Sequence, residues 1–175
     1  DSFCDIFIGE PTTIKEQHVN LRIRKQSESN IFIAGDDPLS VISLIYYSLS
    51  QLVRQSSEGS QFYVFDLFDE DGGYQGALDD LKEKTPNIKI YSKDKPVENL
   101  LEKLKAELDL RINEEESKGR IILAIMNLQK IESMRKDCYS DYSPLAQLLE
   151  KIIKIGPKYG IHTFMHIQNY NQLME

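Results

Sequence analysis

The chain has 175 residues, enough for one domain with a hydrophobic core. Its hydrophobic content of 41% and charged content of 28% are typical of a globular protein, and its formal net charge is −7. This acidity argues against an autonomous nucleic-acid binder, which would carry a basic patch and a high isoelectric point. No apolar run approaches the roughly 18 residues of a membrane span, so we expect no membrane contact by this segment. Two isolated cysteines and no signal peptide indicate a cytoplasmic domain, although its parent chain can be membrane-anchored.

In chain order, the apolar pattern predicts a short hairpin followed by alternating strands and helices. Residues 4–8 and 19–24 have the alternation of paired strands, with a turn at Pro11. The later predicted strands are 31–34, 62–66, 88–91, 120–126 and 161–167, and the predicted helices are 38–54, 74–84, 96–117 and 144–155. Such alternation is typical of a parallel sheet covered by helices on both faces. We therefore expect a three-layer αβα domain over residues 30–175, preceded by a β-hairpin within residues 1–29.

The first strand of this domain, its glycine turn and the following helix have the arrangement of a phosphate-binding loop without its chemistry. When the pattern G-x-x-x-x-G-K-[ST] starts at Gly35, Ser40 falls at the second glycine and Val41 at the lysine. The hydroxyl position also holds an aliphatic residue, so neither phosphate nor Mg²⁺ finds its usual partner. Asp36 and Asp37 add negative charge at the helix N-terminus, where a phosphate would otherwise lie. The sequence thus predicts a loop that no longer supports hydrolysis, with no catalytic residue and weak nucleotide binding.

A second apolar strand, residues 121–125, lacks the acidic residues expected of an ATPase. In P-loop ATPases such a strand ends in an Asp that organises Mg²⁺, often followed by a Glu that polarises water. Here the next two residues are Met126 and Asn127. One missing motif would leave the segment as a central strand of another α/β fold. Two motifs missing at matched places favour an ATPase fold that has lost its catalytic groups.

Four segments carry a resemblance to a known family. They are Ile31–Gly35 (IFIAG), residues 104–111, residues 121–131 (IILAIMNLQKI) and residues 156–168 (GPKYGIHTFMHIQ). Their order and spacing over residues 30–170 resemble the FtsK/SpoIIIE/HerA group of ring-forming translocase ATPases. The resemblance implies a P-loop NTPase-like, RecA-like fold. Gln168 takes the place of that family's γ-phosphate sensor.

The departures from the family pattern fall on the catalytic positions, which indicates a vestigial nucleotide pocket. Its predicted residues are Gly35, Asp36, Asp37, Ser40, Val41 and Gln168. The resemblance implies a non-hydrolysing module of a larger DNA translocase, acting in assembly or substrate placement, with ATP and Mg²⁺ bound elsewhere in the parent protein. Two alternatives stay open: an ATP-binding and hydrolysing DNA translocase subunit, and a substrate-recognition module of a type VII secretion system. The implied partners are other ATPase modules of the same chain or ring, and either duplex DNA or a secreted protein.

Other candidate groups have simpler explanations. The acidic residues at 66–71 match no metal-binding loop, and a solvated loop is the favoured interpretation. His162 and His166 lie on one face of a strand but lack a third ligand, so we expect no metal. Basic clusters at residues 22–25 and 151–158 are interpreted as solvated faces. If the domain docks on a partner, residues 139–144 and 170–174 are the candidate apolar surfaces.

Overall fold

The computed structural model describes residues 3–12, 18–69, 72–74, 76–113, 119–135 and 143–173. The strands are β1 (Phe3–Gly9), β2 (Val19–Arg24), β3 (Ile31–Ala34), β4 (Gln61–Asp66), β5 (Ile88–Tyr91), β6 (Ile121–Met126) and β7 (Ile161–Ile167). The α-helices are α1 (Pro38–Gln55), α2 (Asp80–Lys84), α3 (Val97–Asn113) and α4 (Pro144–Ile155). Short 3-10 helices are η2 (Leu128–Lys130), η3 (Glu132–Met134), η4 (Gly156–Tyr159) and η5 (Tyr170–Leu173).

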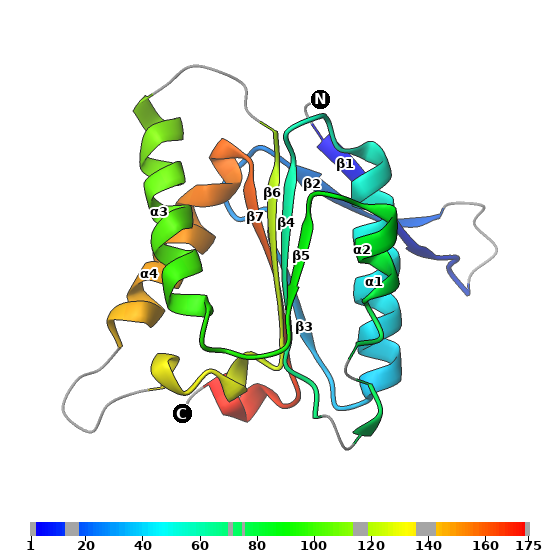
Figure 1. The fold of residues 1–175 in the computed structure, drawn as a ribbon. Helices are drawn as coiled ribbons and strands as arrows, with labels where there is room; N and C mark the ends of the chain where they lie inside the picture. Colours follow the sequence, from blue (N-terminus) through cyan, green and yellow to red (C-terminus); the bar gives the residue numbers. More distant parts are fainter. Residues whose placement is uncertain are drawn as a thin grey trace.

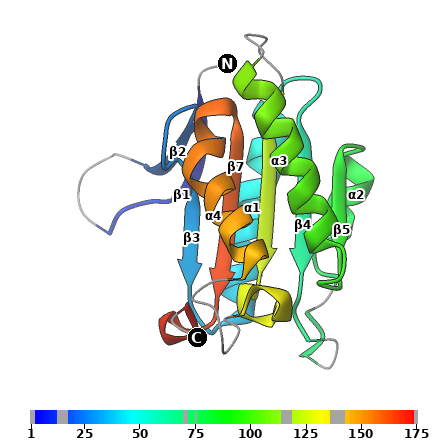
Figure 2. The same ribbon diagram turned by 90° about the vertical axis from the view of Figure 1, so that its left-hand side faces the viewer.

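Five strands form a parallel sheet in the order β3-β7-β6-β4-β5. Helices α1 and α2 cover one face and α3 and α4 cover the other (Figure 1). Strand β3 lies at one edge and β5 at the other (Figure 2). The central strand β6 is buried over its whole length, because helices pack on both of its faces. The predicted three-layer αβα fold is therefore confirmed.

The predicted N-terminal hairpin is also confirmed. Strands β1 and β2 form a separate antiparallel pair in which Cys4 lies opposite Ile23. Cys4, Ile6 and Ile23 are buried in the same hydrophobic cluster as Leu49 and Leu52 of helix α1. The hairpin thus contributes to the hydrophobic core that lies between α1 and the sheet.

The prediction of a helix over residues 74–84 is wrong for most of its length, because α2 begins only at Asp80. Gly76 has φ of +84°, a left-handed conformation that interrupts a right-handed helix. Its backbone N–H donates to the carboxylate of Asp66 at 3.1 Å, so a distant side chain holds the turn. The short helix follows a series of tight turns rather than continuing from Tyr74.

Helix α3 differs in detail from its predicted form. It spans Val97–Asn113, and the remainder of the predicted helix, residues 114–118, lies outside the described residues. The three- and four-residue spacing of Leu104, Leu108 and Ile112 predicts that Ile112 is buried. In the structure Ile112 is 42% exposed, while Arg111 is only 7% exposed. Arg111 is buried because its guanidinium donates to Glu107 on the same helix and to the carbonyl of Tyr159 in η4. The buried position next to η4 is thus occupied by a hydrogen-bonded arginine and not by the aliphatic side chain that the apolar spacing predicts.

Among the described helices, none is long and apolar enough to cross a membrane.

Candidate functional site

The predicted nucleotide site lies at the carboxyl edge of the sheet, where β3, β7 and β6 end side by side. This is the edge at which ligands bind in open α/β sheets. The end of β3 is joined to β7 by a hydrogen bond from the Gly35 N–H to the Ile167 carbonyl, at 3.0 Å. Gly35, Asp36 and Asp37 form the connection to α1, and Gln168 directly follows β7. The fold therefore places these predicted residues at one edge of the sheet.

The connection between β3 and α1 is only three residues long, because the helix already begins at Pro38. The carboxylate of Asp37 accepts hydrogen bonds from the backbone N–H of Ser40, at 3.1 Å, and from the Ser40 hydroxyl. These bonds hold the pKa of Asp37 below its ordinary value. Pro38 has no N–H to offer. The helix N-terminus that would attract a phosphate is thus capped by the chain's own carboxylate.

The position aligned with the P-loop lysine points into the protein. Val41 is 4% exposed and lies in the hydrophobic cluster beneath α1, and Ile42 beside it is also buried. Ser40 is exposed in the first turn of the same helix. The predicted residues Gly35, Asp36, Asp37 and Ser40 are therefore brought together, whereas the side chain of Val41 faces the core.

At the end of β6, Asn127 stands where an ATPase would place its acidic groups. Its φ and ψ of 59° and 53° are left-handed, and its side chain is fully buried. The Nδ2 amide donates to the Leu67 carbonyl at 3.3 Å, and Oδ1 accepts from Nε2 of Gln129 at 3.3 Å. Both ends of the amide are satisfied within the protein. Unlike the carboxylate that it replaces, this amide carries no negative charge to hold Mg²⁺ and does not act as a base toward water.

His166 bridges the ends of β6 and β3. Its Nδ1 accepts the backbone N–H of Asn127 at 3.2 Å, and its Nε2 donates to the Gly35 carbonyl at 2.8 Å. One accepting and one donating nitrogen define a neutral imidazole. Burial keeps the pKa of His166 below its ordinary value, while the bond to Gly35 opposes that shift. The ring of Phe68 stacks on the imidazole, with centroids 6.0 Å apart.

Sequence reasoning did not assign His166 to this site. It placed His166 and His162 on one face of β7, which is correct, but a shared face does not reveal their partners. His162 instead contacts the Ser29 carbonyl, at the start of β3. Within the described part of the chain, no group of three or more His, Cys, Asp or Glu residues could hold a metal ion.

Asp66, at the end of β4, lies in a separate polar cavity. The residue is only 2% exposed, so the expectation of a solvated loop is wrong for Asp66. Its carboxylate accepts the backbone N–H groups of Gly76 and Phe68. Burial raises the pKa of Asp66, against the effect of these bonds. The cavity has a volume of about 260 Å³ and is also lined by Asp79 and Lys82. Of the other predicted acidic residues, Asp69 pairs with Lys130 at 2.6 Å, and residues 70 and 71 lie outside the described residues.

The remaining candidates are the two basic clusters, which form ion pairs within the protein, and the two docking segments, which are only partly described. Arg22 pairs with Asp5, Lys151 with Asp109, and Lys154 with Glu150. These pairs reduce the positive charge of both basic clusters. In the candidate docking segment 139–144, residues 139–142 lie outside the described residues. In the segment 170–174, Tyr170 is exposed on η5 and residue 174 lies outside the described residues.

No protein-family model and no curated protein sequence matches this chain. Solved structures do match it. The pCW3 conjugation coupling protein TcpA, in a monomer form with ATPγS, is similar over 95% of this chain, with 20% identity and a TM-score of 0.64. EssC (ATPases 2 and 3) from Geobacillus thermodenitrificans is similar over 98%, with 16% identity and a TM-score of 0.58. The cytoplasmic domain of EssC is similar over 98%, with 14% identity and a TM-score of 0.61.

These similarities establish the fold of the chain. They confirm, at the level of the fold, the resemblance to FtsK/SpoIIIE-type ATPase domains. The matched region covers 48% of the TcpA chain and 33% of each EssC chain, so this chain spans half or less of the proteins that it resembles. The similarity therefore shows a shared fold and does not show that this chain has the activity of those larger proteins.

Proposed function

We propose that this domain is a non-hydrolysing, ATPase-fold module of a larger DNA translocase and acts in assembly or substrate placement. The observation that carries the proposal is the three-residue connection between β3 and α1. In a P-loop, backbone N–H groups and a lysine surround the phosphates. Here the Asp37 carboxylate caps the helix, and the residue aligned with the lysine is buried.

The end of β6 supports the same proposal. Hydrolysis by P-loop ATPases needs an acidic group for Mg²⁺ and a residue that positions water. Asn127 and His166 instead join β6 to β3 through neutral hydrogen bonds. Because removal of a single preorganised charge-stabilising group typically costs on the order of a hundredfold in rate, several replacements together leave no measurable turnover.

The expected partners are other modules of the same parent chain or ring. Support comes from the similar EssC structure, which contains ATPases 2 and 3 and is about three times as long as the matched region. The net charge of −7 and the paired basic clusters favour protein contacts over DNA contacts. The same observations support a second candidate function, a substrate-recognition module of a type VII secretion system. For either function we expect the domain to work in the cytoplasm.

A nucleotide-binding translocase subunit is the rival candidate. The observation in its favour is that the similar TcpA structure contains ATPγS. In this case ATP would lie at the carboxyl edge near Gly35, and Asp37 would have to release Ser40 to admit phosphate.

Calorimetry with Mg·ATP separates the two candidates. We expect a dissociation constant in the millimolar range or weaker and no phosphate release. The double variant Asp36→Gly, Asp37→Thr should bind slightly better, because it removes repulsion while threonine still caps the helix. Glu58→Gln, which removes one negative charge just before β4 at the opposite edge, is the control and should change nothing. Micromolar affinity of the unaltered domain would support the nucleotide-binding candidate and overturn ours.

Assembly is tested separately by co-expression. Adjoining modules of the parent chain, produced as separate polypeptides, should co-purify with this domain. If the domain does not bind these modules and instead binds duplex DNA tightly at physiological salt, the proposed assembly role is wrong.

A further inference from the structure

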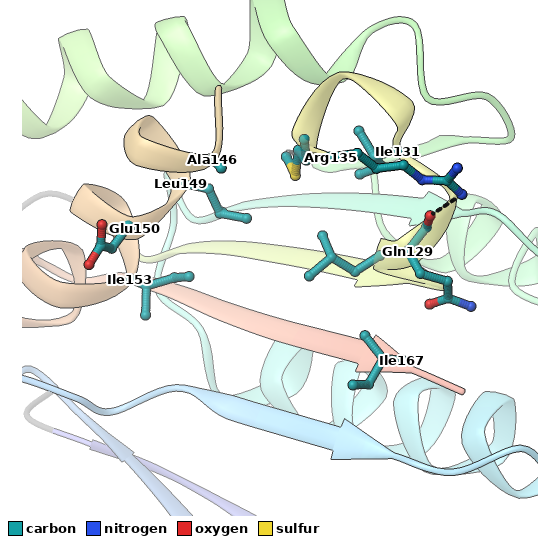
Figure 3. A pocket seen from close by; sticks show the side chains of 10 residues that line it. Gln129, Ile131, Arg135, Ala146, Leu149, Glu150, Ile153 and Ile167 are labelled. Carbon is teal, nitrogen blue, oxygen red and sulfur yellow. Dashed lines mark hydrogen bonds between the residues drawn. The ribbon is translucent and has the colours of Figure 1, made fainter. Parts of the chain in front are cut away.

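A hollow of about 270 Å³ lies between α4 and the η2–η3 segment. Figure 3 shows α4 on one side, η2 and η3 on the other, and Ile167 of β7 as the floor. Its lining residues are Leu128, Gln129, Ile131, Met134, Arg135, Ala146, Leu149, Glu150, Ile153 and Ile167. Seven of these ten side chains are apolar. Ile131 and Leu149 also belong to the hydrophobic core beneath α3 and α4, so the hollow is an open extension of that core.

The walls of the hollow are held in place from several directions. Helix α4 is capped by the Ser143 hydroxyl, which accepts the N–H of Ala146 at 3.1 Å. Its other end is tied to the start of β3, because the Asn30 amide donates to the Ile153 carbonyl at 2.8 Å. On the opposite wall, Nη2 of Arg135 donates to the Gln129 carbonyl at 3.1 Å. Because these elements are tied in place and Ile131, Leu149 and Ile167 are buried, the cavity exists before a ligand binds.

The size of the hollow limits what can occupy it. Sites that enclose a drug-sized molecule have volumes of roughly 300–1,000 Å³. At about 270 Å³ this hollow is smaller, and it suits one or two apolar side chains rather than a nucleotide. Exposed apolar hollows with a polar rim are typical of sites where a peptide anchors a side chain.

The charges at the rim specify the polarity of the occupant. Arg135 and Glu150 lie at opposite ends of the hollow (Figure 3). Glu150 already pairs with Lys154 at 2.5 Å, so its charge is compensated. Arg135 donates one of its five N–H groups to the Gln129 carbonyl. Among the described residues, no carboxylate forms an ion pair with Arg135. The end formed by Arg135 therefore favours a carboxylate, which an arginine fork can bind through two hydrogen bonds.

We propose that this hollow is a docking site for a short segment of a partner polypeptide that carries an apolar anchor next to a carboxylate. The anchor fills the space between α4 and η3, and the carboxylate pairs with Arg135. The site goes beyond the proposed function, since peptide binding there needs no nucleotide and no side chain of the predicted nucleotide pocket, although Ile167 in its floor is joined to the Gly35 N–H. Failure of either proposal leaves the other standing, because one is measured with nucleotide and the other with peptide.

The test uses two probe peptides and the unaltered domain. The peptides are the acetylated, amidated sequence Gly-Leu-Phe-Glu and its counterpart that ends in Gln. Titration followed by ¹H–¹⁵N NMR should shift the resonances of Ile153 and Met134 with the acidic peptide. The Gln peptide should bind roughly tenfold more weakly, because a charge-assisted hydrogen bond is about twice as strong as a neutral one. No shifts at these residues, or equal affinity for both peptides, would overturn the proposal.

Three variants locate the interaction. Arg135→Glu should remove the preference for the acidic peptide, and Arg135→Lys should retain only part of it, because the charge remains while the paired hydrogen bonds are lost. Lys105→Glu makes the same change of charge on the exposed face of α3 and should have no effect. Ala146→Phe should fill the hollow and abolish binding of both peptides, while Ala106→Phe on α3 is its size-matched control. Undiminished binding by Ala146→Phe, or binding of 3-phenylpropionate as tight as that of the peptide, would contradict a peptide-docking site.

Discussion

At the residue scale, two histidines on β7 use the same buried face in different ways. His166 has a partner for each ring nitrogen. His162 donates from Nδ1 to the Ser29 carbonyl at 2.8 Å, while its Nε2 has no hydrogen-bond partner among the described residues. Burial is the largest of the causes that lower the pKa of His162 to about 4, and the charges of Arg120 and Lys25 act in the same direction. The imidazole is therefore neutral in the folded domain at physiological pH.

This burial makes stability depend on pH. An unfolded histidine titrates near pH 6.5, so between pH 6.5 and 4 the unfolded chain binds a proton that folded His162 does not. The contribution of His162 is thus present above pH 6.5 and is lost as pH falls toward 4. We expect about 2 kcal/mol less stability at pH 4.5 than at pH 7 from this residue. Urea unfolding at several pH values measures it.

The variant His162→Asn isolates this effect from the titration of carboxylates. Its side-chain amide can still donate to Ser29 but does not titrate. Its stability should therefore fall less steeply between pH 7 and 4.5 than that of the unaltered domain. Parallel curves for the two proteins would rule out His162 as the source.

At the scale of elements, two glutamines on α1 protect the exposed edge of strand β1. The Gln51 amide accepts the N–H of Phe7 at 2.9 Å and donates to its carbonyl at 3.0 Å. The Gln55 amide does the same for Asp5, at 3.0 and 2.7 Å. One helical turn separates these side chains, and two residues separate their partners along the strand. The amides thus take the place of a neighbouring strand, which an unprotected edge would otherwise recruit.

Removing both amides should loosen the hairpin without unfolding the sheet. For Gln51→Ala, Gln55→Ala we expect a loss of about 2–4 kcal/mol, because four hydrogen bonds are removed and each contributes roughly 0.5–1 kcal/mol. Hydrogen exchange should accelerate at the amides of Asp5 and Phe7. The amide of Ile6 points toward β2 and should change less. Ser43→Ala, on the exposed side of α1, is the control, and equal acceleration in that variant would contradict the proposed protection.

At the scale of the whole molecule, polar and charged side chains at the carboxyl edge of the sheet and in the basic clusters serve internal contacts. Asp37 caps helix α1. Asn127 and His166 join the ends of neighbouring strands. The basic side chains Arg22 and Lys151 pair with acidic neighbours. With a net charge of −7, the long-range field of the molecule repels polyanions.

Duplex DNA should therefore bind weakly to the domain. Affinity for DNA falls steeply with salt in proportion to the number of phosphates neutralised, and Arg22, Lys151 and Lys154 of the two basic clusters are already paired with carboxylates. We expect any binding to disappear by about 0.2 M salt. Fluorescence anisotropy with a labelled duplex over a salt series measures this. Tight binding that persists at higher salt would mean that the domain presents a DNA surface despite its charge.

The sequence by itself determined the local elements and their order. Apolar periodicity located α1, α4 and the buried strand β6, because burial of one face or of a whole strand leaves a pattern in consecutive residues. The caps at Asp37 and Ser143 were also predictable, since a capping side chain acts within three residues of its own position. The missing lysine and acidic groups could be read in the same way.

Only the tertiary structure decided which contacts the residues at the carboxyl edge of the sheet make. The role of His166 depends on the register that places β7 between β3 and β6. The bend at Gly76 depends on the Asp66 carboxylate, which lies ten residues earlier in the chain. The hollow beside α4 likewise exists only where residues from η3, α4 and β7 meet. Contacts between residues distant in sequence leave no periodic signal, because their partners are chosen by packing of the whole chain.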